Sequence, residues 1–207
     1  MIITGFDEAG RGPLAGPVSA AAVILPPGFP LDRVDDSKKL NETRRETAAV
    51  LIREQAAWGI GWVEAAEIDQ INILQASLLA MRRAWDALTA DFPEYAAGNA
   101  GLEGVADGLF CPDLPFPCRA LVKADAQVPE VMAASILAKT ARDRMMIRYS
   151  WFYPEYGYEK HKGYPTKAHR EAIARFGPSP IQRMTFTVKP VQGEFFTARN
   201  KPPSLYY

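Results

Sequence analysis

The chain has 207 residues, with 24 acidic and 24 basic side chains, a hydrophobic fraction of 48% and a charged fraction of 23%. These values predict one soluble globular domain with a substantial core. No signal-like segment starts the chain and no apolar run reaches the length of a membrane span, so we expect a cytoplasmic protein that makes no membrane contact. Cys111 and Cys118 are expected to be free thiols, because two cysteines and two histidines are too few for a disulfide framework or structural zinc.

The N-terminal third of the chain predicts three strands and one helix. Apolar residues at 1–6 and 17–25 predict the first two strands, with a glycine-rich turn between them. Asn41 can cap a helix that continues to residue 57. The segment 58–68 predicts the third strand, and its two tryptophans are expected in the core.

The rest of the chain predicts alternating strands and helices. Leu74, Leu78, Met81, Trp85 and Leu88 recur at steps of four and three, which is the pattern of an amphipathic helix. The predicted elements are a helix over 73–88, strands over 103–110 and 119–125, and helices over 129–149 and 166–176. This order indicates an α/β sheet with helices packed on it.

The charge is unevenly distributed along the chain. Residues 64–113 contain nine acidic and two basic side chains, whereas residues 139–183 contain ten basic and four acidic ones. Solvated surface accounts for such segments in many proteins. The alternative is a basic flank for a phosphate backbone beside an acidic centre that collects metal ions. The distribution alone leaves both interpretations open.

Four carboxylates stand in or at the ends of predicted strands. Asp7 and Glu8 follow the first strand, Asp107 lies in the fourth and Asp125 closes the fifth. Each one alone is compatible with a turn or a helix cap. Together they are costly to bury without a cation, and oxygen ligands without histidine suit Mg²⁺ or Mn²⁺. Two such ions about 3.5–4 Å apart can serve phosphodiester hydrolysis, so the set indicates a phosphoryl-transfer site.

The segment "GFDEAGRGPLAGPV" (5–18) resembles the signature of ribonuclease HII, the type 2 ribonuclease H family. The resemblance covers nearly all of residues 3–186 through "DSKKL" (36–40), "IDQINILQASLLAM" (68–81), "ADG" (106–108), "KADAQVPEVMAASILAKTARD" (123–143) and "KGYPT" (162–166). It implies a ribonuclease H-like α/β fold, with a mixed five-stranded sheet flanked by helices and a helical C-terminal part. The catalytic domain is then expected to span 1–189, followed by a tail over 190–207.

The resemblance also implies an activity. The family's enzymes are endonucleases that need Mg²⁺ or Mn²⁺, hydrolyse the RNA strand of RNA–DNA hybrids, and cut 5′ of single ribonucleotides embedded in duplex DNA. Their products carry a 5′-phosphate and a 3′-hydroxyl, and the implied roles are ribonucleotide excision repair and RNA primer removal. The matching catalytic and metal-binding residues, with two ions per site when substrate is bound, are Asp7, Glu8, Asp107 and Asp125.

Three segments are implied in substrate contact. A glycine-rich turn touches the sugar of the ribonucleotide, a tyrosine senses the following deoxyribose, and a short basic segment contacts phosphate. Because glycine lacks a Cβ, we expect the turn to approach the minor groove closely. The matching residues are Gly10, Arg11 and Gly12 for the turn, Tyr164 for the tyrosine, and Ser37, Lys38 and Lys39 for the phosphate contact.

Other polar positions have competing interpretations. Asp143 lies four residues after Lys139, which fits a surface ion pair, whereas the resemblance implies that Asp143 helps to position the metal-binding residues without touching the metal. His161 and His169 are expected to be surface or capping groups rather than catalysts. Gln182 stands where the family commonly has histidine, so this position departs from the pattern.

Two other function classes remain open at this point. A nucleic-acid-binding module without activity would use the basic segment and keep the acids for structure. A resolvase-type nuclease would cut branched DNA and ignore hybrids. Type 1 ribonuclease H differs because its first acids are separated in sequence, and ribonuclease HIII has an additional N-terminal domain for which the position of Asp7 leaves no room.

The tail contains one segment that suggests a protein partner. "VQGEFF" (191–196) loosely resembles peptides that dock on sliding clamps, with Phe195 and Phe196 as anchors. The alternative is that both aromatic side chains pack back onto the domain. The protein is otherwise expected to be a monomer whose partners are RNA–DNA hybrids and duplex DNA with embedded ribonucleotides.

Overall fold

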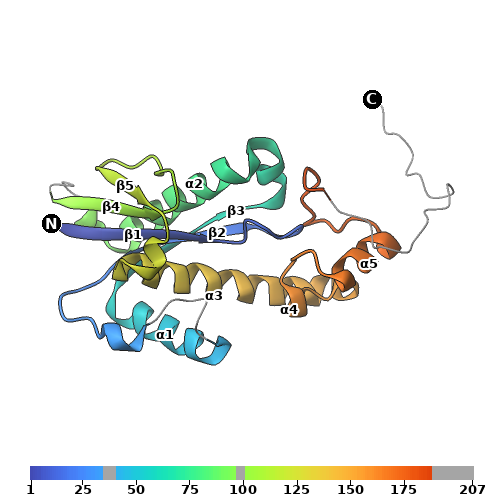
Figure 1. The fold of residues 1–207 in the computed structure, drawn as a ribbon, viewed down its shortest axis with the longest axis horizontal. Coiled ribbons are helices and arrows are strands. Elements are labelled where there is room, and N and C mark those ends of the chain that lie inside the picture. The colour runs from blue at the N-terminus through green and yellow to red at the C-terminus, as the bar shows by residue number, and fades with distance from the viewer. Residues whose placement is uncertain (35–40, 97–100, 188–207) are drawn as a thin grey trace.

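A computed structural model describes residues 1–34, 41–96 and 101–187. Its centre is a five-stranded sheet built from β1 (Ile2–Ala9), β2 (Val18–Ile24), β3 (Ala57–Val63), β4 (Leu102–Asp107) and β5 (Cys118–Leu121). The strand order is β3-β2-β1-β4-β5 (Figure 1). β2 pairs antiparallel with β1 and β3, whereas β4 pairs parallel with β1 and β5. The predicted mixed five-stranded sheet is therefore confirmed.

Helices cover both faces of this sheet. They are α1 (Glu42–Gln55), α2 (Ala65–Asp91), α3 (Pro129–Phe152), α4 (Tyr158–His161) and α5 (Lys167–Phe176). α2 packs on one face against β2 and β3, and α3 packs on the other face against β1 and β2, with α1 against α3 (Figure 1). α4 and α5 lie beyond the sheet at the end of α3, and they form the predicted helical C-terminal part.

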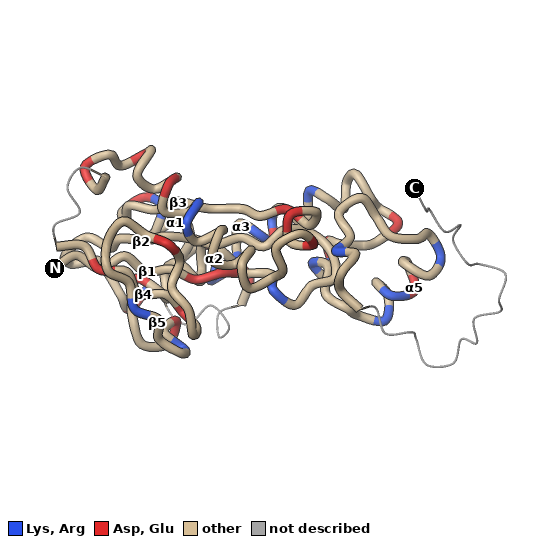
Figure 2. Tube along the Cα trace, turned by 90° about the horizontal axis from the view of Figure 1, so that it is seen from above, with Lys and Arg blue, Asp and Glu red and all other residues tan. Residues whose placement is uncertain are grey.

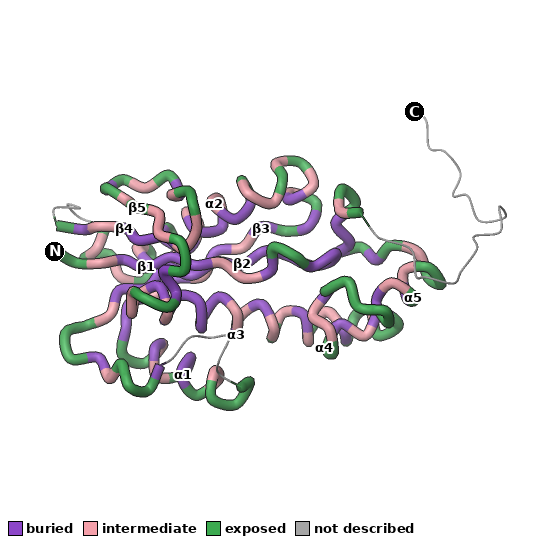
Figure 3. The backbone as a smooth tube through the Cα atoms, in the orientation of Figure 1, coloured by how far each residue is buried: buried purple, intermediate pink, exposed green. Residues whose placement is uncertain are grey.

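The small side chains of β2 allow helices to pack on both faces of the sheet. All of its residues are buried. Ala20 and Ala22 belong to the core on the α2 side, whereas Ala21 and Val23 belong to the core on the α3 side. The alternation follows from the strand period of two. Figure 3 shows the result as buried backbone along the central strands and along α3.

Two predicted helix starts are confirmed by their caps. The Asn41 side chain accepts a hydrogen bond of 2.9 Å from the amide of Arg44. The Thr166 hydroxyl accepts one of 3.2 Å from the amide of His169. Both bonds satisfy an amide that has no partner inside its own helix.

The predicted third strand, 58–68, is too long. β3 ends at Val63, and α2 begins at Ala65. The segment "EAAE" consists largely of good helix formers. Its Glu67 forms two hydrogen bonds of 2.8 Å with Arg83, further along the same helix. Local propensity and this ion pair outweigh the apolar pattern.

α2 contains a break that the apolar pattern does not reveal. Asn72 has a φ of 67° and a ψ of 164°, which are not helical values. Its side-chain oxygen accepts hydrogen bonds of 3.0 and 3.1 Å from the amides of Leu74 and Gln75, as an N-cap residue does. A second helical segment therefore starts at residue 73, where the predicted helix begins.

The fourth and fifth strands end earlier than predicted. β4 stops at Asp107 and β5 at Leu121. The chain then reverses at Lys123, which has a φ of 58°, and enters the short 3-10 helix η3 (Ala124–Ala126). Asp125 thus lies in a turn packed against α3, not at the end of a strand.

Several side chains lie where the sequence predicts them. Trp85 is buried in the core on the α2 side, and Trp58 packs, partly buried, against the core on the α3 side. Cys111 and Cys118 are free thiols. Among the helices of the described residues, none combines the length and the apolar character needed to cross a membrane.

Candidate active site

Three of the four candidate carboxylates meet at the sheet. One oxygen each of Asp7, Asp107 and Asp125, here called the acidic triad, lies within 4.8 Å of the others. β1 and β4 are parallel neighbours in which Phe6 pairs with Ala106, so the next residues, Asp7 and Asp107, are adjacent. Asp125 joins them from η3, and both Asp7 and Asp125 are buried.

Hydrogen bonds hold the acidic triad in place. The amide of Ala124 donates to Oδ1 of Asp107 at 2.7 Å and so joins β4 to η3. The carboxylate of Asp7 accepts a hydrogen bond from the side chain of Ser135 on α3. Its Oδ1 also accepts a hydrogen bond of 2.7 Å from the amide of Glu8. The triad is thus supported by two neighbouring strands, a turn and one helix.

The electrostatics of the triad favour a cation. Burial raises the pKa of Asp7 well above its usual range, and the charges of Glu8 and Asp107 raise it further, against the hydrogen bond from Ser135. A divalent cation supplies the positive charge that this group lacks. Carboxylate oxygens alone, without nitrogen or sulfur, suit Mg²⁺ or Mn²⁺. The residues present therefore fit a divalent metal site.

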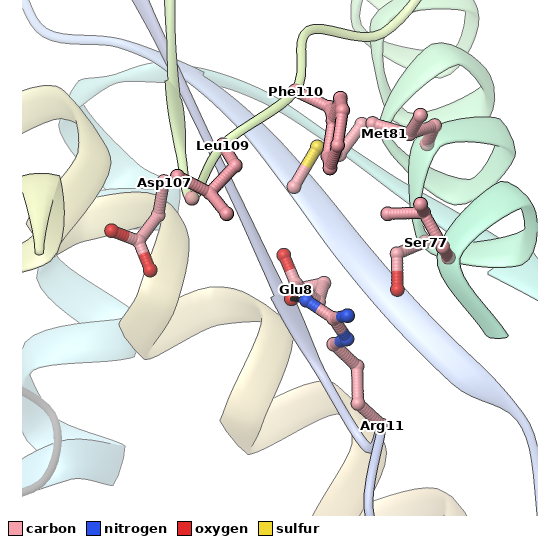
Figure 4. A pocket seen from close by; sticks show the side chains of 10 residues that line it. Glu8, Arg11, Ser77, Met81, Asp107, Leu109 and Phe110 are labelled. Atoms are coloured by element: carbon pink, nitrogen blue, oxygen red, sulfur yellow. Dashed lines mark hydrogen bonds and ion pairs between the residues drawn. The ribbon is translucent and has the colours of Figure 1, made fainter. Parts of the chain in front are cut away.

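Glu8 lies on the opposite face of β1, because successive side chains of a strand point to opposite sides. It lines a pocket of about 180 Å³ together with Arg11, α2 and the loop after β4. Figure 4 shows Glu8 and Arg11 across from Ser77 and Met81 of α2. Arg11 donates to the Glu8 carboxylate at 3.2 Å and lowers its pKa, although burial gives a net increase. Glu8 thus adjoins the acidic triad without being part of it.

The turn after β1 is held from inside by the fully buried Arg183. Its guanidinium donates hydrogen bonds of 2.6–3.0 Å to the carbonyl oxygens of four residues, Gly10, Arg11, Pro13 and Gly16. Burial lowers the pKa of Arg183 to about 9, which still leaves it charged at neutral pH. This one side chain therefore fixes the direction of most carbonyls in the turn.

Gly10 and Gly12 are glycines for different reasons. Gly10 has a φ of 102°, and a Cβ there would overlap the guanidinium of the buried Arg142. Gly10 thus meets an internal packing requirement, and its expected approach to the minor groove stays a prediction. Gly12 is exposed, and a Cβ there would lie 3.6 Å from the ring of Tyr164. Gly12 therefore has open space on the side that faces the Tyr164 ring.

Tyr164 lies on the loop between α4 and α5, and two histidines fix this loop. Nδ1 of His169 bonds the carbonyl oxygen of Tyr164 at 3.0 Å, and the carbonyl of His161 accepts from the Tyr164 amide at 2.9 Å. The two imidazole rings stack with centroids 4.5 Å apart. His169 is fully buried, so of the two expected placements, surface or capping, the surface one is wrong. The packing of α4 and α5 around the ring accounts for this burial.

The basic segment 139–183 does not form a continuous cationic surface. Arg142 and Arg183 are buried. Three further basic side chains form ion pairs: Lys139 with Asp143, Arg144 with Glu46, and Lys167 with Glu171. Figure 2 shows Lys and Arg positions around α5 with acidic positions among them. Half of the basic side chains in this segment thus serve the fold.

The remaining candidates are only partly placed. Asp143 accepts a hydrogen bond of 2.7 Å from Lys139 and lies 3.8 Å from Arg45 of α1. These contacts agree with the predicted ion pair between Asp143 and Lys139. A role of Asp143 near the metal site stays a prediction. Ser37, Lys38 and Lys39 lie outside the described residues, as does the tail 190–207.

Sequence reasoning missed Arg142, Arg183 and Ser135. Ser135 is a polar residue within a largely apolar segment, which is a signal for a buried polar group with a partner, whereas the two arginines stand among other polar residues. The partners of the two arginines are mostly backbone carbonyls between 125 and 173 residues away in sequence. No side-chain pattern identifies such acceptors.

Comparison with known proteins finds relatives over most of the chain. The family described as Ribonuclease HII matches residues 4–189. The ribonuclease HII of Treponema denticola is 56% identical over 196 residues, which are 91% of this chain and 99% of the relative. That of Nitrosococcus oceani is 52% identical over 185 residues, which are 89% and 88% of the two chains.

Solved structures share the fold. A ribonuclease HII of Archaeoglobus fulgidus, solved as a complex with PCNA, is 26% identical with a TM-score of 0.67 and covers 92% of this chain and 98% of its own. The ribonuclease H2 of Pyrococcus horikoshii OT3 is also 26% identical, with a TM-score of 0.66 and coverages of 91% and 95%. Bst-RNase HIII, solved with Mn²⁺, is 20% identical with a TM-score of 0.65 over 84% of this chain and 61% of its own, and supports the fold alone.

Proposed function

Because this chain belongs to the ribonuclease HII family, we propose that it cuts the RNA strand of RNA–DNA hybrids and the phosphodiester 5′ of a single ribonucleotide in duplex DNA. Membership makes it an endoribonuclease, a hydrolase that acts on RNA in RNA–DNA hybrids. The observation that carries the finer proposal is the acidic triad, whose Asp7 stands three residues before the turn that begins at Gly10.

We infer that Asp7, Glu8, Asp107 and Asp125 hold two divalent ions, Mg²⁺ or Mn²⁺, when substrate is present. When bound, such ions supply an activated water and stabilise the leaving oxygen of the phosphodiester. The triad would provide most of the ligands, and Glu8 would contribute from the opposite face of β1. Ser135 keeps the Asp7 carboxylate oriented, and the Ala124 amide does the same for Asp107.

The turn Gly10–Arg11–Gly12 would recognise the ribonucleotide. Only the 2′-hydroxyl distinguishes a ribonucleotide from its DNA neighbours when the bases are the same. The turn follows Asp7 and Glu8 by two residues, so the hydroxyl that it binds determines which phosphate reaches the acids. Tyr164, next to Gly12, would contact the following deoxyribose. Cleavage would then leave a 5′-phosphate and a 3′-hydroxyl.

The products suit the proposed cellular roles. A nick with a 3′-hydroxyl can be extended by a polymerase, as ribonucleotide excision repair and RNA primer removal both require. The segment Ser37–Lys39 would contact the phosphate backbone outside the cut. These roles and contacts rest on the resemblance to the family.

One assay tests the proposed function. The purified protein is incubated with a duplex DNA that contains one ribonucleotide, with Mg²⁺, with Mn²⁺ and with a chelator. We expect one metal-dependent cut 5′ of the ribonucleotide and no cut in the matching all-DNA duplex. Cleavage of branched all-DNA substrates alone would favour a resolvase-type nuclease, and binding without any hydrolysis would favour a non-enzymatic module.

We further propose that the tail docks on a sliding clamp through "VQGEFF" (191–196). The related protein of Archaeoglobus fulgidus was solved as a complex with PCNA, which makes a clamp a reasonable partner. Calorimetry should show that the full chain binds the clamp of its own organism more tightly than a chain truncated after Lys189. A variant with Phe195→Ala and Phe196→Ala should behave like the truncated chain. Equal affinities for all three proteins would exclude the tail.

A further inference from the structure

Hydrogen bonds join the two segments proposed to contact the substrate sugars, which are the turn after β1 and the loop that carries Tyr164. The amide of Leu14, just after the turn, donates to the carbonyl of Gly163 at 2.8 Å. The Arg142 guanidinium donates from Nε to the carbonyl of Pro17 at 2.9 Å and from Nη1 to that of Lys162 at 3.0 Å. The residues around Gly12 and around Tyr164 therefore form one unit.

One face of α3 connects this unit to the acidic triad. Ser135, Arg142 and Met146 are spaced by seven and four residues, which places them on the same face of the helix. The side chain of Ser135 is hydrogen-bonded to the Asp7 carboxylate, and the Arg142 guanidinium is hydrogen-bonded to the carbonyl of Pro17, after the turn. Met146 packs beneath Gly16, where a Cβ would overlap its sulfur atom. Seven residues of helix span about 10 Å, so α3 sets the distance from the acids to the sugar-contacting loops.

Arg183 completes the support from the C-terminal segment. Besides the four hydrogen bonds of its guanidinium to carbonyls between Gly10 and Gly16, its amide donates to the carbonyl of Leu14 at 2.8 Å. Its guanidinium lies over the ring of Phe186, with 5.1 Å to the centroid. A planar guanidinium with five N–H donors can hold several carbonyls at once, whereas a lysine ammonium is a single point of charge.

The carbonyls of the turn are hydrogen-bonded to Arg183, whereas two of its amide groups are available to a ligand. Within the described residues, neither the amide of Arg11 nor that of Gly12 has an acceptor. Both groups lie in an exposed part of the turn. With the carbonyls of Gly10 and Arg11 directed toward Arg183, these amides are donors for a ligand.

We propose that Arg142 and Arg183 are positioning residues that set the preference of the enzyme for a ribonucleotide followed by deoxyribose. Neither side chain touches the substrate. Each one fixes backbone groups, and Arg142 also fixes the spacing between the turn and Tyr164. This inference rests on the proposed function, because the preference concerns the substrate named there.

The test compares two substrates for each variant. kcat/KM is measured on a duplex DNA with one ribonucleotide and on a hybrid whose RNA strand is uniform. The ratio of the two values does not depend on the fraction of folded enzyme, so a general loss of stability leaves it unchanged. The variants are Arg142→Lys and Arg183→Lys, which keep the charge, with Arg142→Gln and Arg183→Gln where a lysine variant does not fold.

A matched control comes from Arg83, which also binds a carbonyl and a carboxylate but lies on α2 away from the turn. Arg83→Lys should keep the wild-type ratio. We expect the ratio to fall by about tenfold or more in the Arg142 and Arg183 variants, with the Mg²⁺ dependence of hybrid cleavage unchanged. A tenfold fall is the loss expected when one well-oriented contact in the transition state is misplaced.

The failures of the two proposals are distinguishable. Ratios within about twofold of the wild type in both arginine variants overturn the inference, as does an equal loss on both substrates. A wild-type protein that cuts neither duplex with Mg²⁺ or Mn²⁺ overturns the proposed function, and the inference with it. Only an active wild type with altered variant ratios supports the positioning role.

Discussion

The carboxylate of Asp107 accepts a hydrogen bond of 2.7 Å from the backbone amide of Ala124, the residue that precedes Asp125. Asp107 is the last residue of β4, and Ala124 is the first of η3. The bond therefore ties Asp107 to the residue next to Asp125, the triad member 18 residues further along the chain. Since a carboxylate has two oxygens, Asp107 can hold η3 with one and offer the other to a metal ion.

Substitutions at Asp107 should separate these two roles. Asp107→Asn keeps an acceptor oxygen and loses the charge, so we expect near wild-type stability and a loss of cleavage of about 100-fold or more. Asp107→Ala also leaves the Ala124 amide without its partner, which should cost about 1–2 kcal/mol of unfolding free energy. Urea unfolding measures the stability of the two variants, and cleavage rates measure their activity. Equal stability of the two variants would show that the bond contributes nothing.

Asp7→Asn should abolish cleavage and leave the fold intact. The buried Asp7 carboxylate has a pKa raised by burial and by the charges of Glu8 and Asp107, so its charge is a cost to the folded protein without metal. An uncharged amide removes that cost, and we expect a melting temperature equal to or above the wild-type value. Hybrid binding should survive or tighten, because repulsion of phosphate falls. Wild-type cleavage rates at saturating Mg²⁺ would remove Asp7 from the site.

The parts of the molecule that local patterns determine could be predicted from the sequence. The caps at Asn41 and Thr166 act on amides a few residues away, and the alternation in β2 reflects two covered faces. The acids could be identified because several carboxylates are costly to bury together without a cation and because the family motif is long. In the same way, the start of the second part of α2 agrees with its apolar pattern.

Long-range features were out of reach. Arg142 and Arg183 bond backbone carbonyls, and nothing in a side-chain pattern marks which carbonyls lie nearby. The burial of His169 could not be predicted, because it depends on how α4 and α5 pack. The segment at 64–68 was predicted as a strand because apolar alternation does not register the ion pair between Glu67 and Arg83. The missed residues are those that orient the site.

Metal binding should release protons and strengthen as pH rises. The raised pKa of Asp7 means that a metal ion competes with a proton for the carboxylate. Without metal, the same shift lowers stability as pH rises through the folded pKa, because the unfolded chain ionises Asp7 more easily. Calorimetry of Mn²⁺ binding in two buffers of different ionisation enthalpy measures the number of protons released, with Asp7→Asn as the control. A pH-independent affinity without proton release would contradict this prediction.

Gly10→Ala and Gly12→Ala should fail for different reasons. A Cβ at Gly10 would overlap the Arg142 guanidinium and strain a φ of 102°, so we expect lost stability together with lost cleavage. A Cβ at Gly12 has room in the free protein, 3.6 Å from the Tyr164 ring, and should leave the melting temperature unchanged. It would occupy the space proposed for the sugar, so single-ribonucleotide cleavage should fall by about tenfold or more while Mg²⁺ affinity stays constant. Normal cleavage by the Gly12 variant would reject the proposed role of the turn.

His169 should make the protein less stable as pH falls. Burial, with a smaller contribution from the charge of His161, lowers the pKa of His169 from 6.5 to about 4. Its Nδ1 donates to the Tyr164 carbonyl, and its buried Nε2 has no hydrogen-bond partner among the described residues, so a second proton there would place a charge in a buried position. The unfolded chain takes up this proton below its ordinary pKa, whereas the folded protein resists until about pH 4.

The stability contributed by neutral His169 is therefore complete above pH 6.5 and is lost between 6.5 and about 4. At about 1.4 kcal/mol for each pKa unit, the loss is on the order of 3 kcal/mol. His169→Asn keeps a donor near Nδ1 and cannot titrate, so its unfolding free energy should be lower at neutral pH but fall less on acidification. His161→Gln, which removes only the half-buried ring, is the matched control. Urea unfolding at several pH values across this window gives the slope of the unfolding free energy against pH for each protein. Identical slopes for wild type and His169→Asn would show that another group causes the acid sensitivity.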